Sequence, residues 1–194
     1  SNRNIYVTEF DNSRISKWDS AGNAVGWIGG GSNGWKTSST VTPGLDYRSF
    51  YYPLGVCCDS SGNIYSADYM LQRVSKWSSN GDAIGWIGGG SSGWKTTNST
   101  GVPGADYQSF NSPSWLYVSS AGFIYVPESM NNRVSKWNVN GTAIGWIGGG
   151  SSGWKNGTAP SIGADYQSFA YPFSVFELSG YLYIGDYINS RISK

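Results

Sequence analysis

Short runs of alternating apolar and polar residues are separated along the chain by clusters of glycine, serine, asparagine and aspartate. A period of two, bounded by turn residues, predicts β-strands that pair as an antiparallel meander. In the stretch from residue 51 to 110, four strands of about five residues fit this pattern. They are Gly55–Asp59, Asn63–Ala67, Arg73–Trp77 and Ala83–Ile87.

The same pattern of strands and turns recurs along the chain. The lysines near the end of each third strand lie 58 to 60 residues apart: Lys17, Lys76, Lys136 and Lys194. Two further phrases, Gly-Trp-Ile-Gly-Gly-Gly-Ser-x-Gly-Trp-Lys and Asp-Tyr-x-Ser-Phe, each occur three times at this spacing. Such a period indicates a tandem array of like units.

We therefore predict an all-β protein made of four-stranded antiparallel β-propeller blades in tandem, with three whole repeats and part of a fourth. The chain is a single array with approximate units at 1–50, 51–110, 111–169 and 170–194. The first unit lacks its inner strand and the last lacks its outer strand, so the two ends do not complement each other. We expect a segment of a longer or assembling array.

The motifs of the second unit point to a known family. Pro-x-Gly-Val-x-x-Asp spans 53–59, Gly-Asn-Ile-Tyr-x-Ala-Asp spans 62–68 and Arg-Val-x-Lys-Trp spans 73–77. Together they resemble the NHL repeat, and this resemblance implies a β-propeller, often with six blades. The third and fourth units depart from the motif, because Ser114–Tyr117 and Ser174–Glu177 replace its first strand.

Each unit is roughly 15 residues longer than a compact blade repeat of about 40 to 45 residues. The excess falls between the fourth strand and the next first strand, as in Trp94–Tyr107. This connection leads from the rim of a blade back to the axis, so we expect every insertion to cross the same face. That face is the predicted working surface.

The amino-acid composition excludes several classes of function from our prediction. The net charge is +1, no basic run stands out and no stretch reaches the roughly 20 apolar residues of a membrane span, so we expect neither nucleic acid nor a membrane span. The chain has no histidine, and its two cysteines, Cys57 and Cys58, are adjacent, which leaves no zinc site and no common general base. From this we predict no catalytic residue and no metal site, and hence no enzyme.

An acidic and a basic residue recur five positions apart, across the turn between the second and third strands. One interpretation makes them a ring of anion ligands. We favour structural ion pairs that tie a hairpin or join blades, since active sites seldom occur once per repeat. The pairs are Glu9 with Arg14, Asp68 with Arg73, Glu128 with Arg133, and Asp186 with Arg191.

Two sets of insertion residues are candidates for a ligand face. The aspartates of Asp-Tyr-x-Ser-Phe are either calcium ligands or acceptors of backbone N–H bonds that fold the loop. The tryptophans before each insertion either stack on sugar rings or wedge between blades, and we favour the wedge. These residues are Asp46, Asp106, Asp165, Trp35, Trp94 and Trp154.

Some loops carry glycosylation patterns. Asn98, Asn140 and Asn156 each begin an Asn-x-Ser/Thr triplet. Threonines of the Thr/Ser/Pro-rich insertions resemble O-glycosylated segments; they are Thr37, Thr40, Thr96, Thr97 and Thr100. Covalent glycans at these positions are conditional on export.

Two functions fit these features. The first is a non-catalytic extracellular structural protein at the cell surface, a fibre, filament or adhesin component that self-associates through its repeats. The alternative is a closed β-propeller that binds a glycan or a protein on its insertion face. Apart from the calcium alternative and attached glycans, we expect no cofactor.

Overall fold

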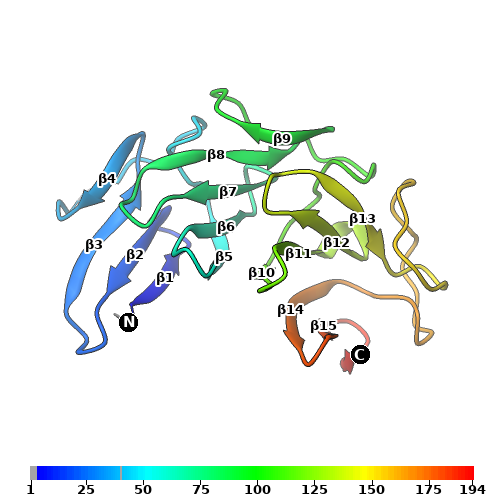
Figure 1. The fold of residues 1–194 in the computed structure, drawn as a ribbon. Coiled ribbons are helices and arrows are strands. Elements are labelled where there is room, and N and C mark those ends of the chain that lie inside the picture. The colour runs from blue at the N-terminus through cyan, green and yellow to red at the C-terminus, as the bar shows by residue number, and fades with distance from the viewer. Residues whose placement is uncertain (1–3, 40) are drawn as a thin grey trace.

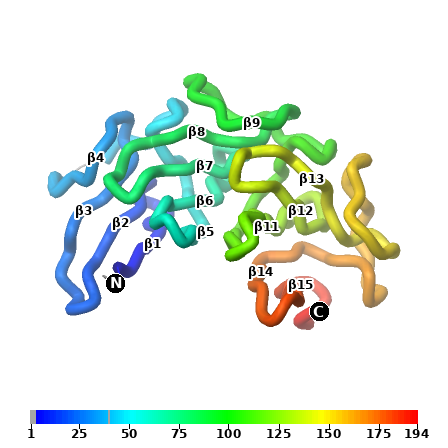
Figure 2. The backbone as a smooth tube through the Cα atoms, in the orientation of Figure 1, coloured from blue at the N-terminus to red at the C-terminus, as the bar shows by residue number. Residues whose placement is uncertain are grey.

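The computed structural model describes residues 4–39 and 41–194. Its strands form separate antiparallel sheets that follow one another around an open arc, with the first strands of the blades on the inner side (Figures 1 and 2). The predicted all-β fold of tandem propeller blades is confirmed, and within the described residues the sheets form no closed ring. Each sheet lies inside one of the four sequence units.

The strand bounds follow the repeat. The first blade contains β1 (Ile5–Glu9), β2 (Arg14–Trp18), β3 (Ala24–Gly29) and β4 (Ser32–Lys36). The second contains β5 (Pro53–Cys58), β6 (Ile64–Asp68), β7 (Arg73–Trp77), β8 (Ala83–Gly88) and β9 (Ser91–Lys95). The third contains β10 (Tyr117–Val118), β11 (Phe123–Glu128), the short 3₁₀ turn η1 (Ser129–Asn131), β12 (Arg133–Asn138) and β13 (Ala143–Ile147). The fourth contains β14 (Pro172–Leu178), β15 (Tyr181–Asp186) and β16 (Arg191–Ser193).

The second blade has five strands, one more than the sequence predicts. The added strand β9 comes from the Ser-Ser-Gly-Trp-Lys phrase, which we had assigned to the insertion. It folds back on β8 at the outer edge, where Lys95 Nζ donates to the carbonyls of Gly88 at 2.6 Å and Ser91 at 2.8 Å. The ammonium also lies 4.8 Å from the centre of the Trp86 ring. The true crossing loop therefore begins after Lys95.

Apolar side chains gather between the blades. Tyr65, Val74 and Ile87 of the second blade pack against Ile124 and Trp137 of the third. A core cluster of this kind joins each pair of neighbouring blades. Because each blade covers the next one, the core is built junction by junction.

The phenylalanine of each Asp-Tyr-x-Ser-Phe phrase anchors its insertion in this core. The Phe50 ring lies 5.3 Å from the Trp77 ring, and the Phe110 ring lies 5.1 Å from the Trp137 ring. All four side chains are fully buried. The insertion of one unit is thus fixed to the third strand of the next.

Cys57 and Cys58 are free thiols on opposite faces of β5. Cys57 packs against the core between the second and third blades, and Cys58 against the core between the first and second. Burial raises the pKa of Cys58 to about 12 and also raises that of Cys57, so neither is a reactive thiolate. Over the described ranges, no helix is long and apolar enough to cross a membrane.

Candidate ligand-binding face

The recurring acidic and basic residues meet directly in three blades. Nitrogen to oxygen distances are 2.8 Å for Arg14–Glu9, 2.9 Å for Arg133–Glu128 and 2.9 Å for Arg191–Asp186. In the second blade the carboxylate of Asp68 instead accepts the backbone N–H of Tyr51 at 2.9 Å and of Leu71 at 3.1 Å. Asp68 and Arg73 are both fully buried but form no direct ion pair.

Each of the three later arginines also holds the insertion of the preceding unit. Arg133 donates to the carbonyls of Ala105 at 2.8 Å, Asp106 at 2.7 Å and Ser109 at 2.8 Å. Arg73 and Arg191 bond to the equivalent carbonyls of their own preceding insertions. The donors face the protein, which favours a structural role over a ring of anion ligands.

The aspartates of the insertions fold their own loops. Asp46 accepts the backbone N–H of Arg48 at 2.8 Å and the hydroxyl of Ser49 at 2.6 Å. Asp165 makes the same two contacts in its loop, and Asp106 makes the first of them. No group of three or more acidic or cysteine side chains in the described ranges could hold a metal ion. The insertion aspartates therefore do not gather into a carboxylate cluster, and the calcium alternative stays a prediction.

Two of the three insertion tryptophans lie between blades. Trp35 Nε1 donates to the carbonyl of Ser79 at 3.1 Å, and Trp94 Nε1 donates to the carbonyl of Val139 at 3.0 Å. Both rings are half-buried. Trp154 is more exposed, at 38%. The first two thus act as the wedges that we favoured and offer little surface for stacking on a sugar.

The glycosylation candidates lie at the surface. The side chains of Asn98, Asn140 and Asn156 are exposed, as are those of Thr37, Thr96 and Thr97, while Thr100 is half-buried. Thr40 lies outside the described residues. Their accessibility allows modification but does not test it.

A different set of aromatic residues, which we did not predict from the sequence, is exposed at the inner ends of the blades. Trp115, two residues before β10, is 40% exposed. Phe10 is 40% exposed and its ring stacks on that of Tyr52, with centroids 4.3 Å apart. With Phe173 and Tyr187, which are 48% and 70% exposed, these residues form what we call the aromatic rim.

Hydrogen bonds fix the residues of the rim against neighbouring strands and blades. The carbonyl of Tyr52 accepts the N–H of Tyr69 at 3.2 Å, and Ser114 Oγ donates to the carbonyl of Phe173 at 2.9 Å. Trp115 lies against the second blade, where a Cβ added to Gly55 would come within 2.8 Å of its Cα. The signal in the sequence was the departure of residues 114–117 from the repeat motif.

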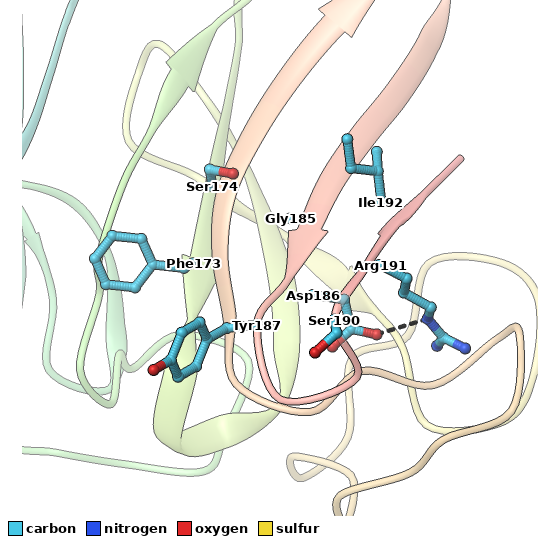
Figure 3. A pocket seen from close by; sticks show the side chains of 8 residues that line it. All are labelled: Phe173, Ser174, Gly185, Asp186, Tyr187, Ser190, Arg191 and Ile192. Atoms are coloured by element: carbon cyan, nitrogen blue, oxygen red, sulfur yellow. Dashed lines mark hydrogen bonds and ion pairs between the residues drawn. The ribbon is translucent and has the colours of Figure 1, made fainter.

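A shallow groove of about 440 Å³ lies along the last blade, beside two rim residues. Figure 3 shows the rings of Phe173 and Tyr187 on the same side of the blade, near the ion pair of Asp186 with Arg191. In the second blade the positions equivalent to the floor of this groove, Ala67 and Val74, are fully buried. We therefore assign the floor of the groove to the surface on which blades pack. The rings of Phe173 and Tyr187 belong to the aromatic rim.

No family model matches the chain. Solved structures with the same fold include an auxiliary nutrient binding protein from Bacteroides ovatus, with a TM-score of 0.60, 15% identity, and coverage of 99% of this chain and 45% of that one. A catalytically inactive variant of virginiamycin B lyase from Staphylococcus aureus has a TM-score of 0.54, 13% identity, and coverage of 99% and 62%. A streptogramin B lyase has a TM-score of 0.50, 12% identity, and coverage of 97% and 60%.

These likenesses show a β-propeller fold, and they support the NHL resemblance at that level. The chain spans less than two thirds of each of these proteins. They also correct one prediction. We had excluded enzymes from the lack of histidine, but two of the similar structures are lyases by name, so this fold supports enzymes and the exclusion was wrong.

Proposed function

We propose that the chain is part of a β-propeller that binds carbohydrate on the aromatic rim. The observation that carries this proposal is the set of exposed rings at the inner ends of the blades. Unlike Trp35 and Trp94, whose indoles are held between blades, Phe10 and Trp115 keep two fifths of their surface exposed. Rings that contribute little to the fold are free to contact a ligand.

Sugar rings present apolar C–H faces that stack on aromatic side chains, with hydroxyls that bond to polar groups at the edge. The rim offers both kinds of surface, because the exposed hydroxyl of Ser174 lies beside the exposed ring of Phe173. A net charge of +1 favours a neutral ligand over a polyanion. A neutral saccharide fits this chemistry.

The comparisons give this proposal its second support. Similar structures from Bacteroides ovatus and Bacteroides thetaiotaomicron are named auxiliary nutrient binding proteins. Binding of a nutrient outside the cytoplasm fits the surface or extracellular location that we expect. The alternative site from the sequence, the insertion tryptophans, is weaker because two of the three are occupied by contacts with the next blade.

The extracellular structural or filament role finds no support in the comparisons. It stays a prediction from the repeats, together with self-association, adhesion and attached glycans. The open arc is compatible with both roles, so the ligand test decides between them.

The test is a binding screen of neutral oligosaccharides by isothermal titration calorimetry, followed by variants. Trp115→Ala should weaken binding of any hit about tenfold, the loss expected for one stacking ring. Tyr166→Ala is the matched control, since this ring is 83% exposed but lies on the third insertion, near Trp154.

Loss of binding in Tyr166→Ala with none in Trp115→Ala would move the site to the insertion. A screen without a hit, or a hit that neither variant weakens, would overturn the proposal.

A further inference from the structure

Four polar side chains form a compact buried block on one face of the second blade. Asp68 pairs with Arg73 across β6 and β7, and Ser66 pairs with Ser75 two residues further along. Residues that lie opposite each other, or two apart on one strand, share a face of a sheet. All four side chains are fully buried.

The third blade shows how this block is satisfied elsewhere. There Glu128 accepts from Arg133 Nε at 2.9 Å and from Arg133 Nη2 at 3.0 Å, and it also accepts the hydroxyl of Ser135. The fourth position of the block is Val126, which is apolar. One carboxylate thus meets both the arginine and the serine.

The second blade differs from the third at two adjacent positions of the block. Ser66 stands where the third blade has Val126, and Asp68 stands where it has Glu128. The first exchange removes bulk and adds a hydroxyl, and the second shortens the carboxylate by one methylene. Both exchanges place a smaller side chain on the same face of the sheet, beside Arg73 and Ser75.

The polar atoms around this point have no protein partner. Arg73 Nε, Ser66 Oγ and Ser75 Oγ are buried without a hydrogen bond. Asp68 makes no hydrogen bond with them; its oxygens accept the backbone N–H groups of Tyr51 and Leu71. A buried polar atom without a partner costs about 1–3 kcal/mol, so three at one point call for a ligand.

We propose that the second blade holds one internal water molecule between Asp68, Arg73, Ser66 and Ser75. The water accepts from Arg73 Nε and from one serine hydroxyl, and it donates to the other hydroxyl and to the Asp68 carboxylate. This uses all four hydrogen-bonding positions of a water and satisfies every orphaned atom. An anion would fit the arginine and the hydroxyls but would be repelled by the ionised form of Asp68.

The site lies where it supports the face that carries the insertions. Arg73 Nη2 donates to the carbonyls of Asp46 at 2.8 Å and Ser49 at 2.7 Å, and Nη1 donates to the carbonyl of Ser99 at 3.2 Å. Nη1 also donates to the carbonyl of Leu45 at 3.4 Å, so the water accepts the one N–H of this guanidinium that is left, at Nε. It therefore holds in place the side chain that joins the insertions of the first two units.

A crystal structure of the chain at about 1.5 Å resolution tests the proposal. We expect a density peak about 3 Å from Arg73 Nε and Ser75 Oγ. The double variant Ser66→Val/Asp68→Glu gives the second blade the residues of the third, and should lose the peak without lowering the unfolding temperature. The reverse variant Val126→Ser/Glu128→Asp should create a second peak in the third blade.

A solution measurement covers the case in which a variant does not fold. In a water-selective nuclear Overhauser experiment on the unaltered chain, Arg73 Hε should show a cross-peak to water and Arg133 Hε should show none. Absence of the water peak, with Asp68 in direct contact with Arg73, would overturn the proposal. An anomalous peak at this point after a bromide soak would also overturn it, because the occupant would then be an anion.

Discussion

The indole Nε1–H of Trp94 donates to the carbonyl oxygen of Val139 at 3.0 Å, so the outer strand of the second blade is held by a turn of the third. Trp35 makes the same contact with Ser79 one junction earlier. The Gly-Trp-Lys phrase thus makes contacts both within its own blade and with the next blade. Its lysine closes the outer hairpin of its own blade, and its tryptophan joins that blade to the next.

The first prediction concerns this joint. Trp94→Phe keeps an aromatic ring but removes the N–H donor and part of the indole, and should lower the free energy of unfolding by about 1–2 kcal/mol. Trp94→Ala also removes the packing, and should cost about 3 kcal/mol. Urea denaturation followed by circular dichroism measures both. Trp154→Phe is the control and should cost less than about 0.5 kcal/mol, since Trp154 has no such bond to another blade in the described residues.

The second prediction uses two matched glycines in the turn between the third and fourth strands. Gly22 and Gly81 have nearly the same positive φ, 84° and 85°. A Cβ at Gly81 would come within 3.0 Å of Ile28 and Trp35 of the first blade, whereas nothing lies within 4 Å of one at Gly22. Both alanine substitutions place a Cβ at the same positive φ and therefore cause the same backbone strain.

Gly81→Ala should therefore destabilise the protein by about 1–3 kcal/mol more than Gly22→Ala does. Thermal unfolding of the two variants measures the difference. Equal losses of stability in the two variants would mean that the first and second blades can move apart at Gly81 at little cost in free energy.

The third prediction concerns the buried ion pairs. Arg133→Ala leaves Glu128 buried without its counter-charge, and should cost about 3–5 kcal/mol. Arg14→Ala breaks the same pair in the first blade, where both side chains are about one-fifth exposed, and should cost at most about 1 kcal/mol. Guanidinium denaturation compares them. A similar loss in both variants would contradict the importance of burial.

The fourth prediction is a pH dependence. Burial raises the pKa of Asp68 to about 7, although nearby Arg73 lowers it. The folded state then holds this proton more tightly than the unfolded state. The stability from Asp68 is present below its ordinary pKa of about 4 and is lost as the pH rises toward 7, by up to about 1.4 kcal/mol per unit.

Asp68→Asn should remove this loss. The free energy of unfolding of the native chain, minus that of the variant, should fall between about pH 4.5 and 7.5. A difference that does not change with pH would mean that Asp68 stays ionised throughout.

Much of the fold could be predicted from the sequence, because strand periodicity and turn residues act locally. The predicted third strand, Arg73–Trp77, is that of the structure, and the fourth, Ala83–Ile87, differs by one residue. The outer strand Ser91–Lys95 was missed, because its glycine-rich sequence has no alternating pattern. It pairs only once Lys95 can reach the carbonyls of the hairpin.

The partners of the functional side chains depended on the tertiary structure. Asp68 and Glu128 occupy the same position of the repeat, yet one carboxylate accepts only backbone N–H groups and the other meets its arginine. Trp94 became a joint and Trp115 an exposed ring, because only the first has another blade packed over it. The sequence by itself determined the repeat and its strands, which depend on neighbours along the chain. The packing of one blade on the next decided which of the repeated residues remain free to bind a ligand.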